Sequence, residues 1–262
     1  MDPTQPEPTP VERALAAALH TDSSVRQEAA LRLGTVAEDE HAPAMVAMLV
    51  SEPDFYVRET LTWAVVARGA AAMPHLLAAL EGDEPSRVQV LHALSKLQDP
   101  AAVEHILPLA NDPDDAVAAK AWWALGRTGT PEAAPALLAH LGDTDEARRR
   151  ELSRALEQLG EPAVAGLAER LADPESDLVT RRHAAEVLVL IGDPGARGAV
   201  DALIGAVEGD EKEVAVIAVE ALAALDDPRV DEALQRLRDG EDRWLAITAE
   251  WLLSDRGERS GR

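Results

Sequence analysis

A short pattern recurs eight times along this chain, and its even spacing restricts the fold more than any other feature. The copies align without gaps at these anchor positions: Val25, Val57, Ser86, Val117, Arg148, Thr180, Val214 and Trp244. Successive anchors are 32, 29, 31, 31, 32, 34 and 30 residues apart. A fixed period of this length is typical of stacked helix pairs, so the sequence predicts an all-α solenoid.

An acidic residue stands three positions before every anchor: Asp22, Asp54, Asp83, Asp114, Asp145, Asp177, Glu211 and Glu241. A carboxylate can accept hydrogen bonds from the free N–H groups of a first helical turn and favours the positive end of the helix dipole. We therefore expect the second helix of each pair to begin directly after this acid. Small and apolar residues at anchor +4, +7, +8 and +11 give that helix a buried side.

Glycine follows at anchor +12 in four copies, Gly69, Gly129, Gly160 and Gly192, where a left-handed residue can end a helix. Proline at anchor +14 suits the first turn of the next helix: Pro100, Pro131, Pro162, Pro194 and Pro228. The first helices are expected over residues 11–19, 42–50, 73–81, 101–110, 132–141, 163–172, 198–208 and 229–238. Arginine at anchor +1 in five copies is expected to pair with the recurring acids of adjacent layers.

The repeats divide the chain into three parts. Residues 1–10 read as a disordered, proline-rich tail, residues 11–255 as a single solenoid, and residues 256–262 as a second disordered tail. The first ten residues do not read as a signal peptide. The predominance of arginine over lysine and the abundance of alanine are typical of bacterial proteins, and we expect a cytoplasmic location.

The charge and the residue types exclude several classes of function. The formal net charge is −23, which disfavours binding to nucleic acid and to anionic membranes. The chain has no cysteine, which removes disulfides, thiolate metal sites and a cysteine nucleophile. The seven histidines are scattered over different repeats without a metal-binding pair, and no glycine-rich phosphate loop occurs. The sequence therefore predicts no catalytic residue, metal or cofactor.

Two segments carry a resemblance to a known family: VAAKAWWALGRTG at residues 117–129 and VRQEAALRLG at residues 25–34. They resemble HEAT repeats of the phycobilin-lyase type, and the likeness covers nearly the whole chain. It implies a right-handed α-α superhelix of about eight helix pairs. In such solenoids the second helices line the concave face, so anchor −2, −1, +2, +3, +6 and +10 are expected to face inward. The family includes scaffolds, lyases, hydroxylases and glycosylases, so the fold does not fix the chemistry.

Aromatic and basic residues gather at these inward positions. Trp63, His92 and Trp123 share anchor +6 in three successive repeats, and the chain's single Phe and single Tyr, Phe55 and Tyr56, are adjacent. Arginine and aromatic residues dominate protein-binding hot spots. The predicted partner-binding residues are Phe55, Tyr56, Trp63, His92, Lys120, Trp123, Arg127, Arg150 and Arg154. The alternative is that these rings pack sideways between layers.

The sequence thus predicts a non-catalytic scaffold or adaptor that binds a peptide or partner helix in its concave groove. The partner is expected to be acidic or of mixed charge, with apolar anchors. The alternative function is a HEAT-like lyase or DNA-glycosylase-type enzyme that uses the same groove, although a base-exposing enzyme must grip phosphates. Trp122 is expected to fill space against a first helix, and Trp244 and Trp251 to seal the final layer.

Overall fold

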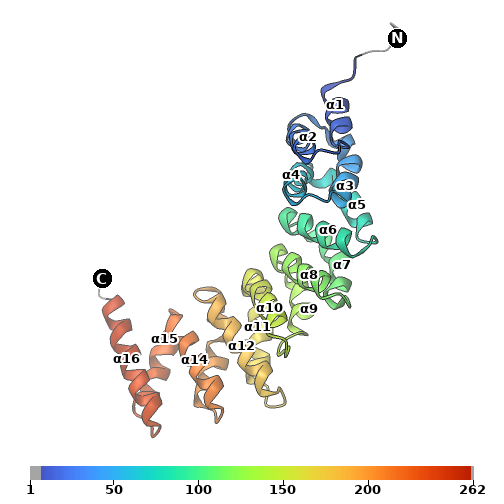
Figure 1. The fold of residues 1–262 in the computed structure, drawn as a ribbon. Helices are drawn as coiled ribbons and strands as arrows, with labels where there is room; N and C mark the ends of the chain where they lie inside the picture. The colour runs from blue at the N-terminus through green and yellow to red at the C-terminus, as the bar shows by residue number, and fades with distance from the viewer. Residues whose placement is uncertain (1–6, 261–262) are drawn as a thin grey trace. The chain divides into compact units, whose positions relative to one another are not determined.

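The computed structural model describes residues 7–260, which form an α-α superhelix of consecutive helix pairs (Figure 1). The chain divides into two compact units, Met1–Thr128 and Gly129–Arg262, called unit 1 and unit 2 below. Unit 1 contains helices α1 to α8 and unit 2 contains α9 to α16. All the described elements are helical, which confirms the predicted all-α class.

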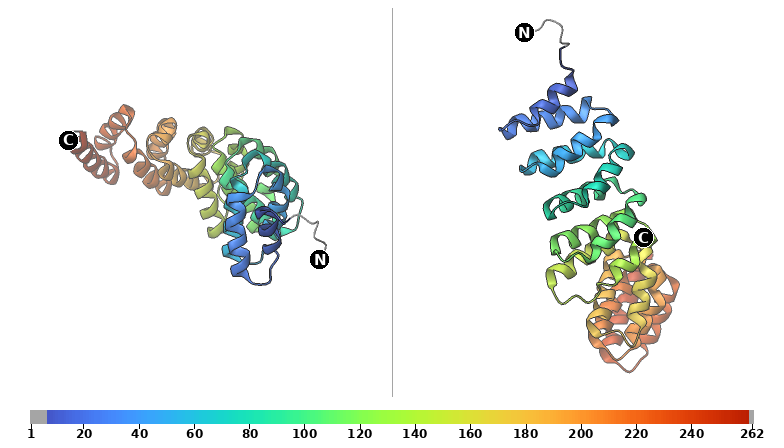
Figure 2. Two further views of the ribbon diagram at one scale, coloured as in Figure 1. Left: turned by 90° about the horizontal axis from the view of Figure 1, so that it is seen from above. Right: turned by 90° about the vertical axis from the view of Figure 1, so that its right-hand side faces the viewer.

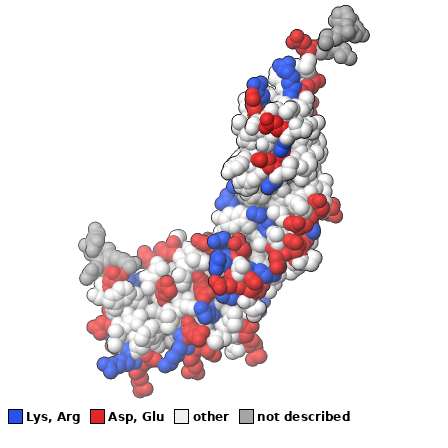
Figure 3. Space-filling model, viewed as in Figure 1, with Lys and Arg blue, Asp and Glu red and all other residues white. Residues whose placement is uncertain are grey.

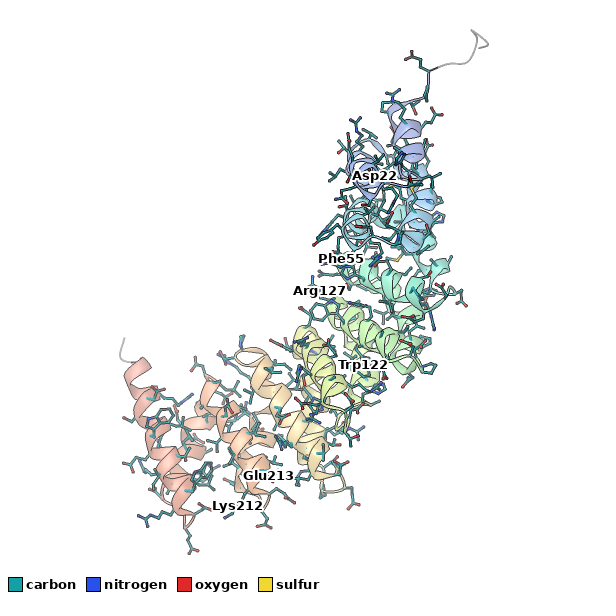
Figure 4. The ribbon with its side chains drawn as sticks, in the orientation of Figure 1. Asp22, Phe55, Trp122, Arg127, Lys212 and Glu213 are labelled. Carbon is teal, nitrogen blue, oxygen red and sulfur yellow. The ribbon has the colours of Figure 1, made fainter. Side chains whose placement is uncertain are left out.

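The second helices of the pairs have these bounds: α2 Ser23–Val36, α4 Phe55–Val66, α6 Glu84–Leu97, α8 Asp115–Thr128, α10 Glu146–Leu159, α12 Leu178–Ile191, α14 Lys212–Ala224 and α16 Arg243–Ser260. Six of the eight predicted acids accept backbone N–H groups at the start of their helices: Asp22, Asp54, Asp83, Asp114, Asp145 and Asp177. Figure 4 labels Asp22 in unit 1. Glu211 precedes α14 without a capping hydrogen bond from its side chain.

The last repeat departs from the predicted alignment. Asp242, and not Glu241, accepts the N–H groups of Trp244 (2.9 Å) and Leu245 (3.1 Å). If the capping acid defines anchor −3, the anchor of this repeat is Leu245 and not Trp244. Ala249 and Leu252 then occupy anchor +4 and +7, and both are buried, as the pattern requires. The predicted anchor Trp244 was therefore wrong by one residue, because two acids in succession made the alignment ambiguous.

The first helices have these bounds: α1 Pro10–Ala17, α3 Ala42–Ser51, α5 Met73–Ala79, α7 Val103–Ile106, α9 Ala134–Leu138, α11 Glu161–Ala172, α13 Val200–Glu208 and α15 Pro228–Arg238. Several are preceded or extended by 3-10 turns: η1 Asp39–His41, η2 Gly69–Ala71, η3 Pro100–Ala102, η4 Leu107–Asn111, η5 Pro131–Ala133 and η6 Gly195–Ala199. The predicted helix over 101–110 is thus divided. Pro108 lies in its middle, where it removes a backbone donor and its ring crowds the preceding turn.

The four glycines at anchor +12 have positive φ angles: 49° at Gly69, 67° at Gly129, 71° at Gly160 and 60° at Gly192. The predicted helix-ending conformation is confirmed there. In the third repeat the same position is Gln98, which also takes a left-handed φ of 54°. A side chain at such a φ is strained, so the geometry of the repeat, rather than glycine alone, imposes this turn.

Within each unit neighbouring second helices pack on one another in one layer, except for α14 and α16, and the first helices form the layer beside it. The right-hand view of Figure 2 shows the helix pairs of unit 1 one above another. The core lies between the two layers and consists largely of alanine, leucine and valine. Small side chains bring neighbouring second helices close together. A Cβ atom built on Gly34 of α2 would lie 3.6 Å from Cβ of Ala64 on α4.

The recurring arginines do not form the predicted ladder with the capping acids. They reach mainly the loop between the two helices of their own pair: Arg58 donates to the carbonyls of Glu52 (3.0 Å) and Pro53 (2.8 Å). Arg26 pairs with Glu52 of the next repeat at 2.7 Å. The capping acids are engaged by backbone N–H groups, so the arginines pair with carbonyls and with other carboxylates.

The ends of the helical region lie close to the predicted ones at the N-terminal side, where α1 begins at Pro10. At the C-terminal side α16 continues to Ser260, beyond the expected end at residue 255. Arg256, predicted to lie in a tail, bonds Asp231 Oδ1 at 2.7 Å and the carbonyl of Leu225 at 2.7 Å. Residues 1–6 and 261–262 of the two predicted tails lie outside the described residues. None of the described helices combines the length and apolarity needed to cross a membrane.

Candidate protein-binding surfaces

The structure divides the predicted binding residues between the units: seven lie on unit 1, and Arg150 and Arg154 lie on unit 2. On α4 of unit 1, Phe55 and Tyr56 are exposed and meet edge to face, with ring centroids 5.5 Å apart and planes at 80°. Trp63 lies two turns further along α4 and is 57% exposed. Its ring therefore stands on the surface and is not buried between layers, the alternative that the sequence left open.

Helix α6 brings two groups onto these α4 residues. Lys96 Nζ lies 5.2 Å from the ring centroid of Trp63, a cation–π distance. His92 Nε2 lies 3.0 Å from Glu59 Oε1 of α4. Burial lowers the pKa of His92, as do Lys120 and Lys96, whereas Glu59 raises it. The net direction is downward, because the burial of the imidazole is the largest influence on this pKa.

Helix α8 continues the same face. Trp123 is partly buried, and the guanidinium of Arg127 lies 5.9 Å from its ring centroid. Arg127 Nε also donates to the carbonyl of Ser95 at 3.4 Å, which joins α8 to α6. Lys120 is partly buried and contributes positive potential at His92. Figure 4 labels Phe55 and Arg127 in unit 1, and Figure 3 shows charged groups interspersed with uncharged surface there.

The N-terminal aromatic surface is the name we give to this face of unit 1, formed by Phe55, Tyr56, Trp63, His92, Lys96, Lys120, Trp123 and Arg127. It comes from α4, α6 and α8, three second helices in succession. Lys96 was assigned to the groove by its position, but its contact with Trp63 was not predicted. The surface combines exposed rings with cations and can contact apolar groups and carboxylates together.

Trp122 shows how sharply one position changes the role of a ring. It is 0% exposed, and its indole Nε1 donates to the carbonyl of Ala110 at 2.9 Å. That carbonyl belongs to η4, the continuation of the first helix of the same repeat. The predicted structural role of Trp122, packing against a first helix, is confirmed.

On unit 2, Arg150 and Arg154 are exposed on α10. Each already pairs along its own helix, Arg150 with Glu146 at 2.7 Å and Arg154 with Glu151 at 3.0 Å. Both line a hollow of about 550 Å³ that α12 and α14 also border, with Leu190 among its apolar side chains. Exposed ion pairs contribute only about 0–1 kcal/mol, so a partner carboxylate could replace Glu146 or Glu151 at little cost.

His183, predicted to face the groove, is instead 1% exposed between α10 and α12. Its Nδ1 accepts the N–H of Gly142 at 3.2 Å, and its Nε2 lies 2.8 Å from Ser153 Oγ. Burial lowers the pKa of His183 to about 4. The prediction failed because this residue, at anchor +3, contacts the preceding layer. A neutral imidazole that is hydrogen-bonded at both nitrogens serves packing.

Trp244 and Trp251 of α16 do not seal the final layer as predicted. They are 49% and 64% exposed, and Ile247 between them is also exposed. The corrected anchor, Leu245, explains this: Trp251 is then at anchor +6, the position of Trp63 and Trp123. Choosing Asp242 as the capping acid would have revealed these surface residues from the sequence alone.

Among the residues that the structure describes, no group of three or more His, Cys, Asp or Glu side chains is placed to hold a metal ion. The two histidines with lowered pKa values, His92 and His183, lie on different units and in different surroundings. Within unit 1, His92 lies beside the carboxylate of Glu59.

The comparisons with known proteins agree with the helical-repeat geometry. Residues 73–157, 107–188 and 164–254 match the family model for HEAT repeats, and these matches together extend over more than half of the chain. No curated protein matches the sequence.

Three solved structures are among those to which this chain is similar. The complex of CpcE and CpcF of phycocyanin lyase from Nostoc sp. PCC7120 has 24% identity over 97% of both chains, with a TM-score of 0.44. The archaeal HEAT-like repeats protein from Thermococcus onnurineus NA1 has 15% identity over 81% of this chain and 95% of that one, with a TM-score of 0.51. Kap121p bound to Nup53p has 14% identity over 94% of this chain and 33% of Kap121p, with a TM-score of 0.57.

Proposed function

We propose that this chain, which belongs to the HEAT-repeat family, is a non-catalytic interaction module that binds a peptide or helix of a partner protein. The observation that carries the proposal is the exposed tryptophan at the centre of the N-terminal aromatic surface. Trp63 is 57% exposed, lies on the same helix as Phe55 and Tyr56, and has Lys96 against its ring. Large apolar rings left in water together usually mark an interaction site.

The contacts suggest the chemistry of the partner. Phe55, Tyr56 and Trp63 would take its apolar side chains. Lys96 lies against Trp63 and Lys120 lies near His92, and both would favour carboxylates at neighbouring positions. Because α4, α6 and α8 succeed one another, a bound segment would cross three layers, a distance of roughly 20 Å at the usual spacing of packed helices. A peptide or helix covers that distance, whereas a small metabolite would fill only part of it.

The remaining predicted residues fit the same chemistry. Trp123 would extend the apolar contact, and Arg127 would pair with a carboxylate while remaining against the indole. On unit 2, Arg150 and Arg154 would supply further positive charge to an acidic segment. The solved complex of Kap121p with Nup53p shows that a protein of this fold can bind another protein, which supports the class of function.

The test is a crosslinking pull-down from the native cell with wild-type protein and a Trp63→Ala/Trp123→Ala variant. We expect partners that the wild type captures to be lost from the variant, with helical circular dichroism preserved. Leu19→Ala is the matched control. Leu19 is an exposed apolar residue just after α1, and it is not part of the N-terminal aromatic surface. Retention of every wild-type partner by the double variant would show that the assignment is wrong.

A further inference from the structure

A groove runs between α14 and α16, the last two second helices of unit 2. It has a volume of about 440 Å³. Val216 of α14 and Trp244 and Trp251 of α16 line it and are about half exposed. Val219 and Leu252, each 5% exposed, form its apolar floor. We call this feature the C-terminal groove.

Within unit 2, α14 and α16 are more widely spaced than α10 and α12 or than α12 and α14. Helix α12 packs closely against α14, as α2 does against α4 and α6 against α8. Helix α16 is held mainly by α15, the first helix of its own pair. The facing side chains of α14 and α16 therefore do not pack together. They line an opening that reaches the buried Val219 and Leu252.

The charge of the lining distinguishes this groove from the N-terminal aromatic surface. Glu220 of α14 and Asp255 of α16 line it, and none of its lining residues is a lysine or arginine. Glu220 is exposed, and it also borders the hollow that Arg150 and Arg154 line. A ligand with cations beside its apolar groups would meet complementary charge on both helices.

A second copy of the chain fits the groove poorly. Two copies that met through this face would bring Glu220 and Asp255 of one against the same acids of the other. The chain as a whole carries a formal net charge of −23, which adds to the repulsion. The charge of the lining therefore favours a different, basic protein.

We propose that the C-terminal groove binds a cationic amphipathic helix of a partner protein, at a site separate from the N-terminal aromatic surface. Apolar side chains of that helix lie against Trp244 and Trp251, its lysines or arginines pair with Glu220, and Asp255 adds to the negative charge of the lining. Trp244 and Trp251 are seven residues apart on α16, about 10 Å along the helix axis. This separation matches apolar groups at i and i+7 on a ligand helix laid along the groove.

The probe is a fluorescein-labelled 18-residue synthetic helix with leucine at i, i+3, i+4 and i+7 and lysine elsewhere, measured by fluorescence anisotropy with the full chain. We expect Trp251→Ala to weaken its binding about tenfold or more, since a tryptophan anchor is lost. Glu220→Lys should weaken it by about threefold to tenfold through charge reversal. The same helix with glutamate in place of lysine should bind at least tenfold more weakly.

Two controls keep the result specific. Leu31→Ala removes an exposed apolar side chain from α2 of unit 1 and should leave binding of the lysine probe unchanged. Thr248→Arg obstructs the groove while leaving both tryptophans in place, and it should weaken binding even if Trp251→Ala alters the fold. The proposal is overturned if the probe does not bind, or if binding survives Trp251→Ala and Glu220→Lys. It is also overturned if sedimentation shows a wild-type dimer that Trp251→Ala dissociates, because a second copy would then fill the groove.

Discussion

The N-terminal aromatic surface and the C-terminal groove both expose a tryptophan at anchor +6 but surround it with opposite charges. Trp63 on α4 has Lys96 against its ring, whereas Trp251 on α16 shares its groove with Glu220 and Asp255. The position in the repeat thus decides that the ring reaches the surface. The neighbouring side chains decide which partner it favours, so two surfaces built by one rule are expected to select ligands of opposite charge.

The largest expected effect tests the claim that position decides exposure. Trp122 is buried at anchor +5, next to the slot of the exposed rings, so Trp122→Ala should lower the free energy of unfolding by about 3–5 kcal/mol. Trp63→Ala and Trp251→Ala should each cost less than about 1 kcal/mol, since their rings are largely solvated. Urea denaturation followed by circular dichroism measures all three. Similar losses in the three variants would remove the distinction between structural and surface rings.

A second prediction concerns the buried His183 between α10 and α12, which contrasts with the exposed tryptophans between α14 and α16. The folded pKa of His183 is about 4, below its ordinary value of 6.5, because the imidazole is buried. The folded state thus binds fewer protons than the unfolded state. The stability that neutral His183 provides is complete above pH 6.5 and is lost as the pH falls toward 4, in total about 3 kcal/mol.

The check is the pH dependence of unfolding in wild type and His183→Asn. Asparagine keeps an acceptor for the N–H of Gly142 but does not titrate. The free-energy difference between the two proteins should shrink as the pH falls from 7 to 4, whatever the variant's stability at pH 7. If the unfolding free energies of the two proteins ran parallel with pH, water would reach His183 in the folded state, and the prediction would be wrong.

Much of the fold follows from the spacing in the sequence. The acids at anchor −3 placed the start of six second helices, and the glycines at anchor +12 placed three of their ends, those of α8, α10 and α12. These are local signals. A carboxylate accepts the N–H groups of the first helical turn, and a glycine with a positive φ ends the last turn. The break in the first helix near Pro108 was equally local, but was overlooked.

The candidate surfaces were less predictable because they depend on contacts between layers. Periodicity placed Trp63 on the correct face, but it could not show that Lys96 of the next helix covers its ring. It also could not show that anchor +3 in the sixth repeat turns His183 toward the preceding layer. The widened seam beside α16 depends on packing between α15 and α16, which no single helix encodes.

The smallest expected effect tests the alignment on which the comparison rests. Asp242 accepts two N–H groups of the first turn of α16, so Asp242→Ala should cost about 1 kcal/mol of stability. Glu241 makes no such bond, and Glu241→Ala should change the unfolding free energy by less than about 0.5 kcal/mol. Thermal and urea unfolding of the two single variants measure the difference. If Glu241→Ala were the more costly, the anchor would return to Trp244 and Trp251 would leave the slot of Trp63. The two surfaces would then share no common position, and their likeness would be one of residue type alone.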